Sequence, residues 1–179
     1  MSILKVARLG NPVLRQKAKP IPEAEIAAPE IRRLIADMVE TMREYGGAGL
    51  AAPQVHELLQ VIVVDSQEDP ENSRRKPTPL TILINPALTV LSEQIDEEWE
   101  GCLSIPDLRG RVPRHREIKV QAYHPTGKAI SFKARNSFAH VLQHEYDHLM
   151  GEVFLDRMRS FQSLTFLSEY SRYWVRREE

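Results

Sequence analysis

The amino-acid sequence predicts an α+β fold in which mixed or antiparallel β-sheets pack around a central helix, with an amphipathic helix near the N-terminus and another helix near the C-terminus. Two observations predict it: apolar residues recur at helical spacing near both ends, and β-rich runs lie between them. The chain has 179 residues, 42% of them apolar, which is enough for one sizeable core. We therefore expect a single domain over residues 1–179.

The segment from Pro29 to Tyr45 is the predicted amphipathic helix. A proline stands in its first turn and two glycines follow its end, the arrangement typical of helix boundaries. Its apolar residues fall on one face at helical spacing: Ile31, Leu34, Ile35, Met38, Val39, Met42 and Tyr45.

The middle of the chain is predicted to form strands. Runs of apolar and β-branched residues occupy positions 59–65, 81–86, 87–95 and 117–134. The last run contains Pro125, Thr126 and Gly127 and reads as a hairpin that turns there. Residues 66–79 are polar and contain prolines, so we expect an exposed loop.

The central helix is predicted over residues 137–150. It is nearly apolar in its first half and is followed by Gly151, the residue favoured just after a helix. After it, residues 151–158 suggest a short strand and residues 160–177 a C-terminal helix.

Composition excludes several classes of protein. Lysine and arginine number 24 against 25 acidic residues, so no overall charge attracts nucleic acid or an anionic membrane. No apolar run approaches the ~20 residues that cross a bilayer, and the first residues lack the apolar core of a signal peptide. The single cysteine, Cys102, cannot form an internal disulfide. We expect a cytoplasmic, monomeric protein that makes no sequence-specific contact with nucleic acid.

The central helix carries the motif His-Glu-x-x-His. Residues four apart on a helix differ by ~40° in direction and ~6 Å in height, so His144 and His148 can bind one metal ion. Glu145 lies ~100° around from His144, where a general base for a metal-bound water belongs. The alternative is a pair of structural histidines. The helix is otherwise apolar, however, and a cation would supply the partner that buried polar groups require.

Cys102 is the predicted third ligand. His140 is excluded, because it lies ~12 Å along the axis from His148. A lone cysteine is more often a small core residue. Here Gly101 allows close approach of the backbone, and Ser104 and Pro106 break regular structure. Two imidazoles and one thiolate leave a fourth position for water, as in catalytic sites. Residue types alone do not decide between zinc, iron and nickel.

The sequence resembles the peptide deformylases along almost its whole length. Three blocks carry the resemblance in order, GAGLAAPQ (47–54), EGCLS (100–104) and QHEYDH (143–148), preceded by the family-like opening ARLGNPVLR (7–15). Each block alone is modest evidence, but the combination is specific. Zinc peptidases that share His-Glu-x-x-His usually take a third histidine or glutamate downstream, whereas here the candidate is a cysteine upstream.

The resemblance implies a function and a set of residues. His144, His148 and Cys102 would bind one divalent ion per chain, physiologically Fe²⁺, with zinc, nickel or cobalt able to replace it. Glu145 would be the general base, and the Gln54 side chain with the Leu103 backbone N–H would stabilise the oxyanion. The implied substrate is the N-terminal formyl-methionine of a nascent polypeptide, and formate is the other product.

The resemblance also implies how the peptide binds. The segments around Ala48, Gly49 and Gly101 would flank the peptide and pair with its main chain, which tolerates varied sequences. Val141, His140 and Ser137 precede His144 on the helix and are candidates for the methionine pocket. Histidine at 140 departs from the arginine or aliphatic residue usual in the family, which puts the pocket's shape and polarity in doubt.

A second departure is His56, where the family commonly has glycine, so the backbone there is expected to differ. Glu100 and Asp147 are candidates to orient the ligating histidines, or to pair with Arg109 or Arg114. A phosphate-binding interpretation of residues 47–54 fails, because no Lys-Ser/Thr follows the glycines.

Two other functions stay open. One is a metallopeptidase that cleaves internal peptide bonds with the same ion and base, and the other is a non-catalytic module braced by its ion. The C-terminal segment has a mild basic bias, which indicates a solvated helix face or, alternatively, a contact with the ribosome.

Overall fold

The structure is a computed structural model that describes residues 2–66 and 78–175. All strand pairs within its sheets are antiparallel. A five-stranded sheet has the order β1-β2-β3-β6-β7, formed by Gly49–Ala51, Val61–Ser66, Thr78–Val90, Glu117–Tyr123 and Ala129–Arg135. A three-stranded sheet has the order β4-β5-β8, formed by Ile95–Cys102, Ile105–His115 and Thr165–Phe166.

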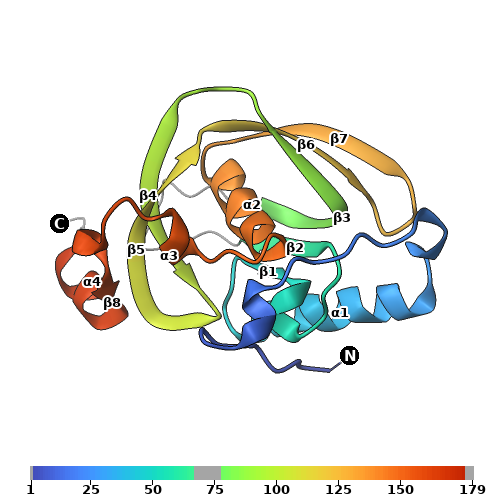
Figure 1. Ribbon diagram of the computed structural model, residues 1–179, viewed down its shortest axis with the longest axis horizontal. Coiled ribbons are helices and arrows are strands. Elements are labelled where there is room, and N and C mark those ends of the chain that lie inside the picture. Colours follow the sequence, from blue (N-terminus) through green and yellow to red (C-terminus); the bar gives the residue numbers. More distant parts are fainter. Residues whose placement is uncertain (1, 67–77, 176–179) are drawn as a thin grey trace.

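The predicted central helix is α2, Asn136–Leu149, and it lies in the middle of the molecule (Figure 1). It contacts β1, β2 and β7 of the larger sheet and β5 of the smaller one. Its buried apolar side chains Ala139, Leu142 and Leu149 pack with residues of the larger sheet. The α+β prediction and the helix bounds are therefore correct to within a residue at each end.

Helix α1, Pro29–Glu44, covers the other face of the larger sheet. Strand β2 explains this division, because successive side chains on a strand point to opposite faces. Ile62 and Val64 pack in the cluster that contains α2, whereas Val61 and Val63 pack in the cluster that contains α1. The larger sheet thus packs against α2 on one face and against α1 on the other, which agrees with the apolar run at residues 61–64 of β2.

The prediction of two separate strands at 81–86 and 87–95 is wrong. They form one strand, β3, whose register with β6 shifts between Ile84 and Ala87. Asn85 lies at this irregularity with a φ of 50°, and its side chain bonds the backbone of Ile21 at both N and O. The predicted exposed loop also begins and ends inside strands, because Ser66 belongs to β2 and Thr78 to β3. Residues 67–77 lie outside the described residues.

Strands β4 and β5 were not predicted as a hairpin. Their sequences carry many charges and two prolines, Pro106 and Pro113, which hide the pattern of alternation. Pro106 lies within β5 and does not break it. The hairpin instead turns at Leu103 and Ser104, because Cys102 pairs with Ile105. The predicted hairpin over 117–134 is correct, and Gly127 takes a φ of 82° in its turn.

The C-terminal predictions are wrong in detail. Residues 151–158 contain the short helix α3, Phe154–Arg157, and no strand. The predicted helix over 160–177 is divided into a 3₁₀ turn at Phe161–Ser163, strand β8 and helix α4, Leu167–Tyr173. Two aromatic side chains of this segment pack against Trp99 of β4. The centroid of the Trp99 ring lies 5.0 Å from that of Tyr170 and 5.3 Å from that of Trp174. Residues 176–179 lie outside the described part.

Over the stretches that the structure describes, every helix is too short or too polar to cross a membrane.

Gly151 and Gly127 form a matched pair for testing what ends α2. Both have a φ near 80°, but a Cβ at Gly151 would lie 2.9 Å from the carbonyl carbon and oxygen of Arg15, whereas a Cβ at Gly127 meets nothing within 4 Å. Left-handed backbone costs a non-glycine residue about 1–2 kcal/mol. We expect Gly127→Ala to lose about 1 kcal/mol and Gly151→Ala at least about 2 kcal/mol of the free energy of unfolding. Equal losses in denaturant titrations would show that the contact with Arg15 is unimportant.

Candidate metal centre

Three of the sequence-predicted residues meet beside α2. Cys102, His144 and His148 each offer one ligand atom, and these atoms all lie within 4.8 Å of one another. The Cys102 Sγ is 3.2 Å from the His148 Nε2. All three side chains are buried. The cysteine from β4 therefore lies next to the histidine pair of α2, although Cys102 and His144 are 42 positions apart in the sequence.

Cys102 is the last residue of β4 and follows a shift in the register of this strand with β5. The register shifts between Glu100 and Cys102, and both of these side chains are buried on the side that faces α2. Gly101 between them leaves room for the side chain of Arg109. A Cβ built at Gly101 would overlap the guanidinium of Arg109, so no larger residue fits there without moving that side chain.

The electrostatics of the cluster favour a thiolate. Burial alone would raise the pKa of Cys102, but charge and hydrogen bonds from His148 and His144 hold this pKa well below its usual value. The thiolate is the form that binds metal. Two imidazoles and one thiolate are a donor set that suits a divalent transition-metal ion, so the residues present fit the predicted cofactor.

Glu100 orients one of the imidazoles. The Nδ1 of His144 lies 2.7 Å from Oε2 of Glu100. Because an ionised carboxylate only accepts, Nδ1 carries the hydrogen and Nε2 keeps its lone pair for a cation. Burial alone would raise the pKa of Glu100, but His144, His140 and Arg114 together hold it well below its usual value.

Arg114 and Asp147 complete a buried ionic network. Arg114 donates its Nε to Glu100 at 2.8 Å and its Nη2 at 3.1 Å, and its Nη1 contacts Asp147. Asp147 also accepts from Arg157 at 2.7 Å and 3.1 Å. Of the two carboxylates considered from the sequence, Glu100 thus supports a ligand directly, whereas Asp147 braces Arg114.

His140 lies one helical turn before His144 and is only 4% exposed. Its Nε2 lies 2.6 Å from Oε1 of Glu100, close enough for a hydrogen bond although the N–H direction departs from the line to the oxygen. His140 does not belong to the group of three ligand atoms. The ring that the sequence placed near the methionine pocket is thus turned toward Glu100.

Glu145 is buried next to the histidines, and a Cβ at Gly49 would meet its side chain. Among the described residues, none offers its Oε2 a hydrogen bond. Burial raises the pKa of Glu145 to about 7, and the nearby His144 and His148 lower it only in part. A carboxyl group with a pKa near neutrality can accept and return a proton at physiological pH.

Gln54 lies in a 3₁₀ turn, Ala52–Val55, with its amide fixed at both ends. Its Oε1 accepts from the Ala51 backbone N–H at 2.8 Å, and its Nε2 donates to Ser104 Oγ at 3.1 Å. The same Nε2 is 3.5 Å from the Cys102 Sγ. Ser104 was expected only to interrupt regular structure, and its role as an anchor for Gln54 was not predicted. Only its place in the EGCLS block hinted at it.

The remaining candidates lie at or next to β1, on the β4–β5 hairpin and on α2. Gly47 and Leu103 are adjacent, because a Cβ at Gly47 would lie 2.8 Å from Leu103 Cδ1, so the 47–54 and 100–104 blocks come together. Gly49 of β1 pairs with Val64 of β2, and the Ala48 carbonyl accepts a hydrogen bond from the backbone N–H of Asp65. Val141 is half-buried on α2.

His56 ends the 3₁₀ turn with a φ of 69°. It therefore takes the left-handed conformation that favours glycine, although histidine occupies the position.

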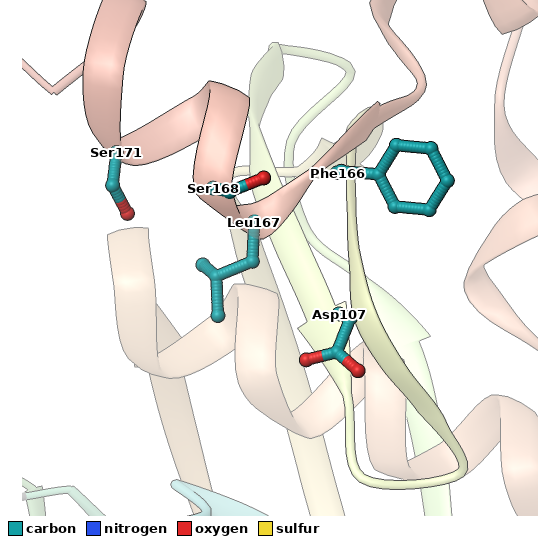
Figure 2. A pocket seen from close by; sticks show the side chains of 5 residues that line it. All are labelled: Asp107, Phe166, Leu167, Ser168 and Ser171. Carbon is teal, nitrogen blue, oxygen red and sulfur yellow. The ribbon is translucent and has the colours of Figure 1, made fainter.

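A separate open pocket of about 430 Å³ lies at the C-terminal segment (Figure 2). Its walls come from β5, β8 and α4, and none of the three candidate metal ligands lines it. The lining residues are Asp107, Phe166, Leu167, Ser168 and Ser171. The metal centre is thus not part of this pocket.

Comparison with known proteins shows that this chain is similar in sequence and structure to peptide deformylases. The family model described as "Polypeptide deformylase" matches residues 3–163. "Peptide deformylase 2" of Pseudomonas putida is 41% identical over 159 residues, which are 89% of each chain. A class I type b peptide deformylase from Acinetobacter baumannii, solved with Met-Ala-Ser bound, has a TM-score of 0.85 and 34% identity over 88% of this chain and 100% of its own. The structure from Thermotoga maritima gives a TM-score of 0.79 at 31% identity, over 89% and 100% of the two chains.

The helix with two histidines and a glutamate, joined by a buried cysteine, defines the class of metal-dependent hydrolases. Within that class, this chain belongs to the peptide deformylase family. Members of this metal-dependent family remove the N-formyl group from nascent peptides.

Replacing Glu100 by glutamine should weaken the centre in two ways. The buried Arg114 loses one of its two anionic partners, and His144 loses a charged acceptor. We expect Glu100→Gln to lose about 3 kcal/mol of the free energy of unfolding and to bind metal about 10–100-fold more weakly. Denaturant titration and competition with a chromophoric chelator measure the two effects.

The control is Glu117→Gln, whose exposed pair with Arg135 should contribute under about 1 kcal/mol. Equal losses in both variants would refute the assignment.

Proposed function

We propose that this chain hydrolyses the formamide bond of N-terminal formyl-methionine on nascent polypeptides and releases formate. The observation that supports the proposal most strongly is the contact between Cys102 Sγ and His148 Nε2. The buried Glu145 directly follows His144, the third member of this cluster. A relative from Acinetobacter baumannii has been solved with Met-Ala-Ser bound, a peptide that begins with methionine.

An amide carbon is a poor electrophile, so the reaction requires a strong nucleophile at neutral pH. Cys102, His144 and His148 would hold a divalent cation, which would supply one by lowering the pKa of water to near neutrality. We propose Fe²⁺ as the physiological ion, with Zn²⁺, Ni²⁺ or Co²⁺ as substitutes. Glu145 accepts the proton of the attacking water, for which its pKa of about 7 is well placed.

Negative charge then develops on the formyl oxygen. We assign its stabilisation to the Nε2 of Gln54 and the backbone N–H of Leu103. Gln54 suits this role because its amide is held by Ala51 and Ser104 before any substrate arrives. One preplaced donor of this kind contributes about 3 kcal/mol to the transition state. Glu145 finally gives its proton to the leaving nitrogen, because a neutral amine leaves more easily than its anion.

The peptide itself is proposed to pair with the backbone around Ala48, Gly49 and Gly101. Contacts to main chain tolerate many sequences, which suits a substrate as varied as nascent chains. We propose that α2 contributes Val141 and His140 to the wall of the methionine pocket. The ribosome contact through the C-terminal segment stays a prediction.

The proposal is tested with formyl-Met-Ala-Ser and unformylated Met-Ala-Ser. The anaerobically purified, iron-loaded protein should release formate from the first peptide and leave the second intact. Formate is measured by a coupled dehydrogenase assay and the peptide products by mass spectrometry. Cleavage of internal peptide bonds without formate would instead identify a metallopeptidase.

Glu145→Gln tests the assignment of the general base. The change keeps the size of the side chain but removes its ability to accept a proton, so kcat should fall by about 10²–10⁴-fold. The bound metal, measured by elemental analysis, should stay at the parent level because Glu145 is not a ligand. Glu44→Gln on the exposed end of α1 is the matched control and should keep full activity. A kcat that survives Glu145→Gln would show that Glu145 is not the proton acceptor.

A further inference from the structure

We propose that His140 is a positioning residue of the metal centre, which acts on His144 through the carboxylate that they share, Glu100. This inference rests on the proposed function insofar as that function requires a cation at His144. It assigns His140 a role besides the one proposed for it in the methionine pocket.

The carboxylate of Glu100 is surrounded on both oxygens. Its Oε1 receives Arg114 Nε at 2.8 Å and His140 Nε2 at 2.6 Å. Its Oε2 receives Arg114 Nη2 at 3.1 Å and His144 Nδ1 at 2.7 Å. An ionised carboxylate offers about four lone-pair sites. Each oxygen of Glu100 therefore has two polar neighbours, and His140 supplies one of the four through a close contact at 2.6 Å.

The contact fixes which nitrogen of His140 carries a hydrogen. At 2.6 Å, a lone pair on Nε2 would face the lone pairs of a carboxylate and repel it. Nε2 is therefore the nitrogen that carries a hydrogen, and its attraction to Oε1 is mainly electrostatic, because the N–H direction departs from the line to the oxygen. Glu100 is only 4% exposed, so solvent does not take the place of this donor when it is removed.

The geometry explains why a second imidazole matters. His140 and His144 are four residues apart on α2 and reach the two different oxygens of one carboxylate. The terminal torsion of a glutamate is soft. Arg114 approaches from β5, and it also contacts Asp147. His140 is thus the contact that ties Oε1 to α2, and it keeps Oε2 turned toward His144.

The test compares side chains with and without a donor at position 140. His140→Leu and His140→Met remove the donor but fill similar space, whereas His140→Gln keeps an N–H. His124→Leu, in the exposed turn between β6 and β7, controls for loss of a histidine. Affinity for Co²⁺ is measured by competition with a chromophoric chelator, and the visible spectrum of the cobalt-loaded protein reports the ligand geometry.

We expect His140→Leu and His140→Met to bind Co²⁺ about tenfold more weakly and to shift the cobalt spectrum. His140→Gln should recover most of the affinity, and His124→Leu should match the parent protein. Adding His140→Leu to Glu100→Gln should cause little further loss, because His140 acts through Glu100. Either aliphatic variant suffices for the comparison if the other does not fold.

Three results would overturn the proposal. Unchanged Co²⁺ affinity and spectrum, with only KM for formyl-methionyl peptides altered, would restrict His140 to the pocket wall. Lower stability of the metal-free protein without a change in affinity would make it a structural residue. Additive losses in the double variant would show that Glu100 is not the intermediary. The Co²⁺ affinity, the cobalt spectrum and the stability are all measured without deformylation, so absence of formate release would count against the proposed function alone.

Discussion

The buried ionic network of Glu100, Arg114 and Asp147 connects the parts of the molecule that form the candidate centre. Glu100 comes from β4, Arg114 from β5 and Asp147 from α2, and all three side chains are at most 6% exposed. Burying these charges is costly unless each one is paired and hydrogen-bonded. The network satisfies this condition only when the β4–β5 hairpin lies against α2, and this arrangement brings Cys102 to the histidines.

The catalytic and structural roles of the residues are therefore difficult to separate. Glu100 accepts from a proposed metal ligand and at the same time neutralises Arg114, whose pKa is raised above its normal value chiefly by Glu100, although burial alone would lower it. Ser104 shapes the hairpin turn and also anchors the amide of Gln54. A substitution at either residue changes the chemistry of the site and the packing of the hairpin together.

The sequence predicted the two long helices well, and the three candidate ligands that it named lie together in the structure. Both predictions depend on local spacing or on a short list of residue types. Helical periodicity placed α1 and α2 to within a residue at each end, and the need for a third ligand pointed to Cys102. The hairpin of β4 and β5 was not predicted because its strands are charged and contain prolines. The orientation of His140 also depended on tertiary structure, since only the packing of β4 on α2 brings Glu100 within its reach.

The C-terminal segment has a further consequence for study of this protein in solution. Trp99 and Trp174 are its only tryptophans, and their rings are in contact across β4 and the end of α4. Trp99 immediately precedes Glu100 in the strand. Intrinsic fluorescence excited at the indole band therefore originates entirely from this junction, and it offers a label-free optical signal for detachment of the last helix from the strand that carries Glu100.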